Sequence, residues 1–450
     1  MNGRISAFCA VLMMVTVTAF AAPRPLTMDE AIDLALKQNK KVSIAKLGVD
    51  KADAKVTEAL GHALPTLNLS AAYTRNIQVP VFFIPDFQNP SSGALSPVRV
   101  GLNNQYQLQA QATQILFNSA VFSGIGASKV YYNAALEQLN SAVAEVVTDT
   151  KKKYFDAMMA RELGRISQAT LDNAMENFKT IDALFREGLV AEFDLIRSQV
   201  AVDNIRPSVT ESEAVYANAI GALQTHIGMD MGDSVVPVGE FQEEQVEFPD
   251  EQVAIETALR ENKDLKALEY QVRVTKEFIS LYTGEYFPTL SLFGNWMHQG
   301  QSDTYSNFVS APSSAVGLNF QINLFNGFQT KARVEQANID HQTVQEQYNQ
   351  LKDIVKLQVR AVLNSLRSSK LRILAQRSTV TQAQRGLEIA RIRYKEGTGS
   401  LLELNDSELA LSHAQINRIQ ALHDYHTTKA DYDRVVASID RKYFRTVETN

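Results

Sequence analysis

The chain has 450 residues, of which 45% are hydrophobic and 21% charged, and its formal net charge at pH 7 is -6. This composition is ordinary for a folded protein and argues against wholesale disorder. The negative charge, without any basic cluster in the sequence, argues against a nucleic-acid-binding surface. A chain of this length would normally form two or three domains.

Residues 1–22 have the three parts of a secretory signal peptide. Arg4 gives a positive start, a short apolar run follows, and a small-x-small motif ends at Ala21. We expect cleavage after Ala21 or Ala22. The single cysteine, Cys9, lies inside this segment, so the mature chain is expected to have no disulfide, no thiol chemistry and no cysteine for lipid attachment.

The rest of the sequence contains one long tandem duplication. Residues 30–40 (EAIDLALKQNK) align with residues 253–263 (VAIETALRENK), and the Pro-Thr-Leu at 65–67 aligns with the one at 288–290. Both matches have a shift of 223 positions (253 − 30 and 288 − 65). A period of this length is far too long for a solenoid and indicates that a whole unit was duplicated.

Each repeat is expected to contain two helices, a pair of strands and a long helical hairpin. The expected domains are the signal peptide at 1–22, the first repeat at 23–240 and the second repeat at 241–450. The first repeat is expected to have helices at 28–39 and 41–62, strands at 65–75 and 105–117, hairpin helices at 119–187 and 190–227, and a hairpin tip near 188. The second is expected to have helices at 250–261 and 263–285, strands at 288–298 and 314–325, hairpin helices at 327–395 and 400–438, a tip near 397, and a short C-terminal tail.

The four expected strands alternate between apolar and uncharged polar residues, as in residues 105–113 with the sequence QYQLQAQAT. Runs of about ten residues with two such faces suit an outer-membrane barrel, whereas one wet face of a soluble sandwich would more often carry lysine and glutamate. No stretch of about 18 apolar residues follows residue 22, so we expect any membrane crossing to use strands. Four strands cannot close a barrel in lipid. Two copies would supply eight strands and three copies twelve.

Residues 76–104, between the first two strands, contain four prolines and several large apolar residues. We expect a loop packed against the outside of the barrel, with an exposed recognition surface as the alternative.

Apolar residues recur every seven positions from Val359 to Tyr394, which indicates coiled-coil packing. A helix of about seventy residues would be roughly 100 Å long, much longer than a compact domain. Pro207 lies inside the return helix of the first hairpin and should kink or interrupt it. The two hairpin tips share an internal motif, Glu-Gly at 187–188 and at 396–397, in which Gly188 and Gly397 are expected to end one helix before the next begins.

With these features in this order, the sequence resembles the TolC family of outer-membrane efflux channels from Leu26 to about Ser438. The resemblance rests on the duplicated Ala-Ile-x-x-Ala-Leu-x-x-Asn segments, the Pro-Thr-Leu strand starts, the Leu-Phe-Asn strand ends and the two glycine-centred tips. It implies a mainly α protein with membrane β structure: a homotrimer whose 12-stranded β-barrel, four strands per chain, continues into a long α-helical coiled-coil periplasmic tunnel.

The resemblance also implies a function and partners. The chain would be the outer-membrane exit duct of a tripartite efflux pump or a type I secretion system, with its helical part in the periplasm. A periplasmic adaptor (membrane fusion) protein and an inner-membrane transporter would open it at its tips, and outer-membrane lipid would surround the barrel. The cargo, whether drugs, metals or proteins, is left open.

Gate residues follow from the same resemblance. Asp194 in the first tip and Glu403 and Asp406 in the second fall on the family's tip acids, and Tyr394 falls on a gating tyrosine. Rings of such carboxylates favour cations in a narrow pore. By spacing alone, the acids would be ordinary solvated residues near helix N-termini. Gly399 stands where the best-known member has a basic residue, so one salt link between tips is expected to be missing.

No phosphate-binding loop and no nucleophile elbow occurs in the sequence, so we expect neither an enzyme nor a cofactor. His423 and His426, close to Asp424 and Asp431, are interpreted as surface residues rather than metal ligands. The alternative function is a periplasmic coiled-coil adaptor or structural tether without its own channel. The two hairpins and the bilayer-length strands argue against that alternative.

Overall fold

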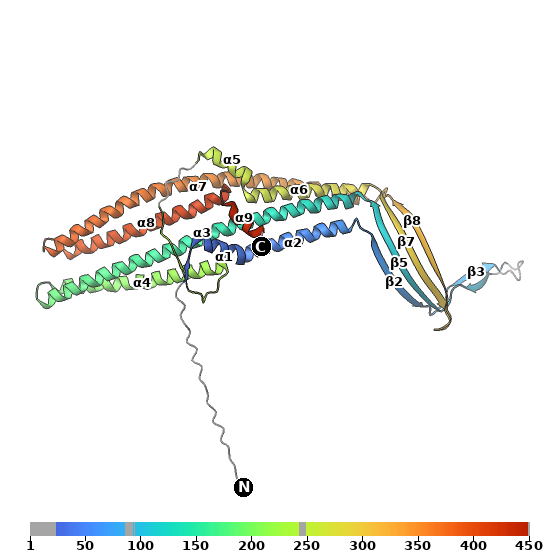
Figure 1. The fold of residues 1–450 in the computed structure, drawn as a ribbon, viewed down its shortest axis with the longest axis horizontal. Helices are drawn as coiled ribbons and strands as arrows, with labels where there is room; N and C mark the ends of the chain where they lie inside the picture. Colours follow the sequence, from blue (N-terminus) through green and yellow to red (C-terminus); the bar gives the residue numbers. More distant parts are fainter. Residues whose placement is uncertain (1–23, 86–92, 94, 243–248, 449–450) are drawn as a thin grey trace, which may run out of the picture. The chain divides into compact units, whose positions relative to one another are not determined.

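The protein is described from a computed structural model, which places residues 24–85, 93, 95–242 and 249–448 (Figure 1). The predicted signal peptide at 1–22 lies outside the described residues. The chain forms two compact units. One comprises 1–42, 143–251 and 359–450, and we call it the tip unit because it contains both hairpin tips; the other comprises 43–142 and 252–358, and we call it the sheet unit.

The sheet unit contains a four-stranded antiparallel sheet with the strand order β2-β5-β7-β8. Its strands are β2 (Thr66–Arg75), β5 (Asn104–Phe117), β7 (Thr289–Ser302) and β8 (Val309–Gln321). The first two match the predicted strands closely. The last two differ, because β7 and β8 both extend farther toward their connecting loop, and β8 ends at Gln321 rather than at 325. The chain leaves the sheet there to reach a turn in which Gly327 has a φ of 64°.

The register of this sheet confirms the predicted alternation. Leu69 lies opposite Ala110, and Ala110 lies opposite Trp296. Ser70 and Gln109 form the next pair, on the opposite face. Because directly paired residues in an antiparallel ladder share a face, one face of the sheet is largely apolar and the other carries most of the Gln and Asn side chains.

The segment between β2 and β5 forms a separate hairpin of β3 (Val81–Pro85) and β4 (Leu95–Arg99). Phe82 and Phe83 are 62% and 63% exposed. The described part of this segment is thus a paired hairpin where a loop was expected, and its packing against a barrel stays a prediction. The two strands pair with each other and not with the main sheet. Residues 86–92 and 94 lie outside the described residues.

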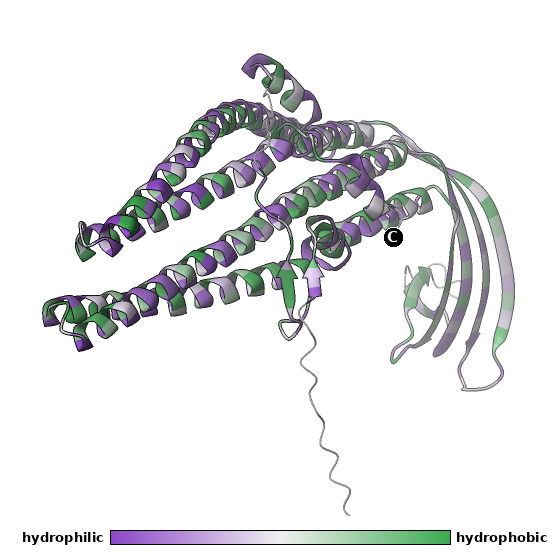
Figure 2. Ribbon diagram, turned by 60° about the vertical axis from the view of Figure 1, so that its left-hand side comes forward, coloured by the Kyte–Doolittle hydropathy of each residue, from purple (hydrophilic) through white to green (hydrophobic). Residues whose placement is uncertain are grey.

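The helices confirm the predicted order. They are α1 (Met28–Gln38), α2 (Lys40–Gly61), α3 (Ser119–Arg186), α4 (Glu192–Ile227), α5 (Glu251–Glu261), α6 (Lys263–Thr283), α7 (Gln329–Lys395) and α8 (Leu401–Val435), with a short 3-10 turn, η2 (Gly284–Tyr286), after α6. Val359, Leu366 and Leu387 of the heptad series are buried. Hydrophilic and hydrophobic residues alternate along the long helices (Figure 2). Among the described residues, no helix is long and apolar enough to cross a membrane.

Helix α4 continues through Pro207, so the predicted interruption is wrong, and the alternative of a kink stays a prediction. Proline removes one backbone donor, and the carbonyl that loses its partner is that of Asp203, four residues earlier. Both residues are exposed. Water can therefore take the place of the missing hydrogen bond.

The tip unit also contains elements that the sequence analysis missed. The strand β1 (Arg24–Leu26) pairs in parallel with β6 (Val235–Pro237), which follows α4. The hydroxyl of buried Tyr154 lies 2.8 Å from the carbonyl oxygen of Leu26 and 2.6 Å from that of Val238, which holds this pair against α3. The C-terminal tail forms α9 (Arg441–Glu448), whose Tyr443 hydroxyl donates to the Asp29 carboxylate at 2.7 Å.

Candidate functional site at the hairpin tips

The two tips have the same backbone geometry. Gly188 has a φ of 71° and Gly397 a φ of 70°, in the left-handed region that glycine adopts without strain. In each tip, the N–H after the glycine donates to a carbonyl five residues earlier: Leu189 to Leu184 and Thr398 to Arg393, both at 2.9 Å. This pattern is a Schellman motif, which satisfies the last carbonyls of α3 and α7 and turns the chain into the return helix.

The tips share one hydrophobic core within the tip unit. Ile181 of α3 is fully buried and packs with Leu387 and Ala390 of α7 and Leu404 of α8. Tyr394, near the end of α7, is half-buried against the same cluster. The first hairpin is thus held against the second at its tip, and separating the two would expose this core.

Tyr394 and Asp194 lie close enough to interact electrostatically. Burial raises the pKa of the Tyr394 hydroxyl, and the negative charge of Asp194 raises it further. A phenol with a raised pKa stays neutral at physiological pH, so it keeps its proton as a hydrogen-bond donor. The structure therefore brings together two of the four predicted gate residues.

The acids of the second tip have different surroundings. Glu403 lies in the first turn of α8, where its N–H donates to the Ser400 hydroxyl at 3.2 Å, and its carboxylate lies 3.2 Å from the Arg393 guanidinium. Asp406 is exposed one turn later and has no ion-pair or side-chain hydrogen-bond partner among the described residues. Their three-residue spacing places both carboxylates on one side of α8.

Arg393 is a tip residue that the sequence analysis missed. Its guanidinium also donates to the Thr398 carbonyl at 3.2 Å. A side chain at Gly399 would begin 3.0 Å from the Cβ of Arg393, so the glycine allows the turn to close over this arginine. The missing salt link between tips, expected from Gly399, stays a prediction, and Arg393 supplies an ion pair within the second tip. The signal that could have identified it is the opposite charges of Arg393 and Glu403 on the two sides of the turn.

Glu408 is a second residue that the sequence analysis missed. Its side chain is only 10% exposed, and its carboxylate accepts from Arg391 of α7 at 3.3 Å and from Asn177 of α3 at 3.1 Å. One carboxylate of α8 therefore connects three helices close to the tips.

His423 and His426 of α8 are not surface residues, so that interpretation is wrong. The His426 ring is buried and stacks on Phe155 with the ring centroids 4.7 Å apart. The His423 side chain is 13% exposed and contacts Asp156 of α3. Phe155 and Asp156 of α3, together with Phe241, lie against these two histidines, which the spacing of the histidines could not show. Within the described residues, no group of three or more His, Cys, Asp or Glu side chains is arranged to hold a metal ion.

The model of the family described as "Outer membrane efflux protein" matches residues 31–229 and 254–435. The chain belongs to the outer membrane efflux protein family. The match covers both hairpins and both strand pairs. It confirms the resemblance inferred from the sequence, the location in the outer membrane, and the predicted class of efflux or secretion channel rather than the adaptor alternative.

Several relatives of this outer membrane efflux protein resemble it over most of their length. It is 22% identical over 413 residues to the nodulation protein T of Rhizobium leguminosarum bv. trifolii, covering 91% of this chain and 84% of that one. It is 24% identical over 385 residues to the outer membrane protein TolC of Vibrio cholerae, and the match covers 84% of this chain and 82% of that one. Its fold is similar to that of the Campylobacter jejuni CmeC outer membrane channel, with a TM-score of 0.76 and 18% sequence identity. The match covers 93% of this chain and 89% of that one.

Proposed function

We propose that this chain is one subunit of a homotrimeric exit duct in a tripartite efflux pump or a type I secretion system. Three copies would form a 12-stranded barrel that continues into a helical periplasmic tunnel. The observation that carries the proposal is an open four-stranded sheet with one apolar and one uncharged polar face, in the same chain as two long helical hairpins. The proposal assigns no catalytic step, cofactor or metal to the chain.

The dimensions of the sheet suit a bilayer. On β7, the face that carries Leu290 and Trp296 reaches the polar side chain of His298 about 26 Å from Leu290 at the usual rise of a strand, close to the roughly 25 Å apolar band of outer-membrane barrels. Toward one end of the strands, Tyr106 lies beside His298 and Phe308, with ring centroids 5.6 Å and 5.2 Å away. Aromatic side chains with a polar atom favour the membrane–water interface.

The edges of the sheet support the trimer. Within the described residues, β2 and β8 each pair with a single neighbour in this sheet. In lipid, the free N–H and C=O groups of an open edge would cost several kcal/mol each. Pairing β2 of one copy with β8 of the next satisfies both edges, and three copies close a ring of twelve strands.

A cysteine pair across this boundary tests the trimer, because the sequence has no cysteine beyond Cys9. Within one chain, β5 and β7 separate Ser70 of β2 from Ser313 of β8, roughly 14 Å at the usual strand spacing. Ser70→Cys combined with cysteine at Ser313, Ala311 or Ala315 is expected to give disulfide-linked trimers on a denaturing gel.

The matched control for this experiment is Ser70→Cys with Ser314→Cys, because Ser314 lies on the opposite face of β8. That pair should not cross-link. Finding only monomers with every same-face pair, in protein that is folded and inserted, would contradict the shared barrel.

The tips are the proposed gate of this duct. We assign Asp194, Glu403 and Asp406 as its acidic residues, Tyr394 as a gating residue, and Gly188 and Gly397 as the turns on which the hairpins reverse. A periplasmic adaptor and an inner-membrane transporter would open the tips, and the duct itself would be passive. The two repeats, 23–240 and 241–450, with a signal peptide at 1–22, are part of the same proposal.

Single-channel conductance of the mature protein in a planar bilayer tests the function. We expect a small conductance, because the tip core described above holds the hairpins together in the resting state. Conductance should rise when the tip links are weakened, for example in Glu408→Ala. A folded trimer that gives no conductance, with or without the substitution, would favour the tether function over the channel.

A further inference from the structure

A row of polar contacts joins α3 to α8 within the tip unit. As the residue number rises along α3 it falls along α8, so the two helices are antiparallel where they meet. We call this row the α3–α8 seam. Its contacts are Lys151–Asp433 at 3.4 Å, Lys152–Asp431 at 2.5 Å, Asp156–His423 at 2.6 Å, Thr170–Ser412 at 3.3 Å and Asn177–Glu408 at 3.1 Å.

The seam lies between the two hairpins, because α3 belongs to the first and α8 to the second. The hydrophobic core that the two tips share lies at one end of the seam. The hairpins cannot move apart at their tips without loosening contacts of the seam. Polar contacts can be exchanged for water at small net cost, whereas a continuous apolar seam would resist such movement.

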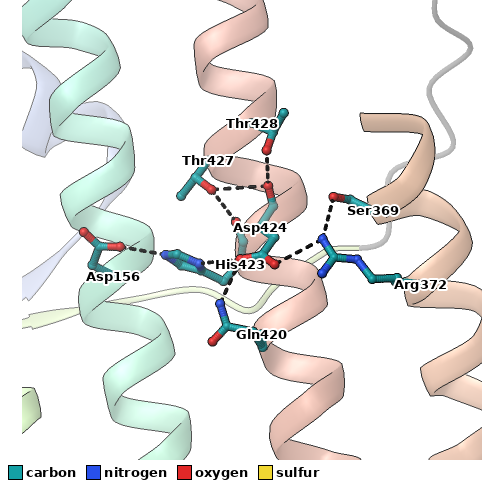
Figure 3. A network of polar contacts seen from close by, with 8 residues as sticks. All are labelled: Asp156, Ser369, Arg372, Gln420, His423, Asp424, Thr427 and Thr428. Carbon is teal, nitrogen blue, oxygen red and sulfur yellow. Dashed lines mark hydrogen bonds and ion pairs between the residues drawn. The ribbon is translucent and has the colours of Figure 1, made fainter. Parts of the chain in front are cut away.

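His423 is the enclosed histidine of this row, with a side chain 13% exposed (Figure 3). Its Nε2 lies 2.6 Å from the Asp156 carboxylate of α3, and its Nδ1 lies 3.5 Å from the Asp424 carboxylate of its own helix. The other oxygen of Asp424 lies 3.2 Å from Arg372 of α7, which also donates to the Ser369 hydroxyl. The imidazole therefore stands at a junction of α3, α7 and α8.

The charges around His423 favour its protonated form. Burial alone would lower its pKa, but the hydrogen bonds and negative charges of Asp156 and Asp424 outweigh burial, so the pKa of His423 lies above its ordinary value. From α3, Lys152 lies one turn from Asp156 and is paired with Asp431. From α7, Arg372 lies on the far side of Asp424.

We propose that His423 is a positioning residue of the gate, and that its protonation strengthens the α3–α8 seam and favours the closed tips. This inference rests on the proposed channel function and adds a regulation to it. Protonated His423 can donate to both carboxylates at once, whereas the neutral ring has one donor and must leave one carboxylate with a weaker contact.

The sign of the pH effect follows from the direction of the pKa shift. A group whose pKa is raised in one state stabilises that state below its ordinary pKa, and loses this contribution as the pH rises through the raised value. If the tips open with the seam parted, His423 returns toward its ordinary pKa. The closed state is therefore favoured at acidic pH, and opening becomes easier as the pH rises. Each unit of pKa difference changes the equilibrium about tenfold per subunit.

The test is single-channel open probability from about pH 5 to about pH 8, the range in which histidine titrates. For the unmodified protein we expect the open probability to rise with pH. His423→Gln, which keeps a hydrogen-bonding side chain but cannot be protonated, should flatten this rise. Asp156→Asn should move the rise in open probability to lower pH, because the substitution removes an anion that favours the protonated ring. The Asp156 side chain is 50% exposed, so this variant is expected to fold.

The matched control is His413→Gln, an exposed histidine of the same helix. It should leave the profile unchanged. A His423→Gln channel with the same pH profile as the unmodified protein would overturn the proposal. A uniform change in conductance at every pH would also overturn it, since that is the signature of a structural role alone. Absence of conductance from the folded, unmodified protein would instead contradict the channel function.

A second experiment tests whether the seam must loosen. The hydroxyl oxygens of Thr170 and Ser412 lie 3.3 Å apart, so Thr170→Cys/Ser412→Cys is placed to form a disulfide across it. The oxidised variant should lose its opening at high pH, and reduction should restore it. Equal opening in the oxidised and reduced forms would show that the seam does not part, and would overturn the proposal.

Discussion

Replacing Glu403 and Asp406 together by alanine is expected to lower the preference of the channel for cations over anions about tenfold. In the proposed trimer the two positions would place six carboxylates around the narrowest part of the pore. Charges of one sign in a narrow opening raise the local concentration of counter-ions and repel co-ions. The reversal potential of the purified channel under a salt gradient measures the effect.

The two single substitutions should not be equal. The Arg393 guanidinium lies 3.2 Å from Glu403 and offsets part of its charge, whereas Asp406 is exposed without such a partner among the described residues. Asp406→Ala should therefore reduce selectivity more than Glu403→Ala does.

The control for this series is Asp340→Ala with Glu346→Ala, which removes the same charge from exposed positions in the first part of α7. It should leave the reversal potential unchanged. If the double tip variant keeps its full selectivity, the acidic filter lies elsewhere, and Asp194 is the next position to test.

Leu404→Ala is expected to destabilise the tips by about 2–5 kcal/mol, the usual range for removing a buried leucine from a packed core. Leu404 lies in the cluster that joins α3, α7 and α8, so the cavity would weaken both hairpins at once. Hydrogen exchange of the backbone amides in the first turns of α8 measures the local opening free energy. The resting conductance should rise in parallel, because the same contacts hold the tips together.

Leu402→Ala removes the same side chain two residues away, where it is 44% exposed. This substitution should lower the stability of the tips much less than Leu404→Ala does, and it should change the conductance little. An equally large effect would contradict this account of the tip core, and would indicate that another subunit covers Leu402.

Sequence patterns were sufficient for every feature that depends on a local period. Two-residue alternation located β2 and β5 closely, and the seven-residue spacing from Val359 onward identified a buried stripe on α7. A glycine between two helical patterns marked each turn, since few other residues adopt a positive φ without strain. The ends of β7 and β8 were less well predicted, because residues 322–324 continue the apolar–polar alternation beyond β8, whereas the polar residues 299–302 belong to β7.

Other features depended on which distant segments meet. The strands β1 and β6 are three residues each and carry no periodic signal, and they form because Tyr154 and its neighbours on α3 accommodate their backbone. The ion pair of Arg393 with Glu403 requires the particular path of the second tip. The β3–β4 hairpin is too short and too rich in proline to be distinguished from an irregular loop by its pattern.

His423 and His426 show most clearly what the sequence pattern could not predict. Their spacing placed them correctly on a helix, but it could not show that Asp156, more than 250 residues earlier, would lie against His423. A helical period specifies which residues of one helix share a face. It does not specify which charged residues of another helix cover that face, because this depends on how the two hairpins pack. Element order, strand faces and tip turns were thus readable from the chain, whereas the polar contacts between hairpins came from the three-dimensional packing of α3, α7 and α8.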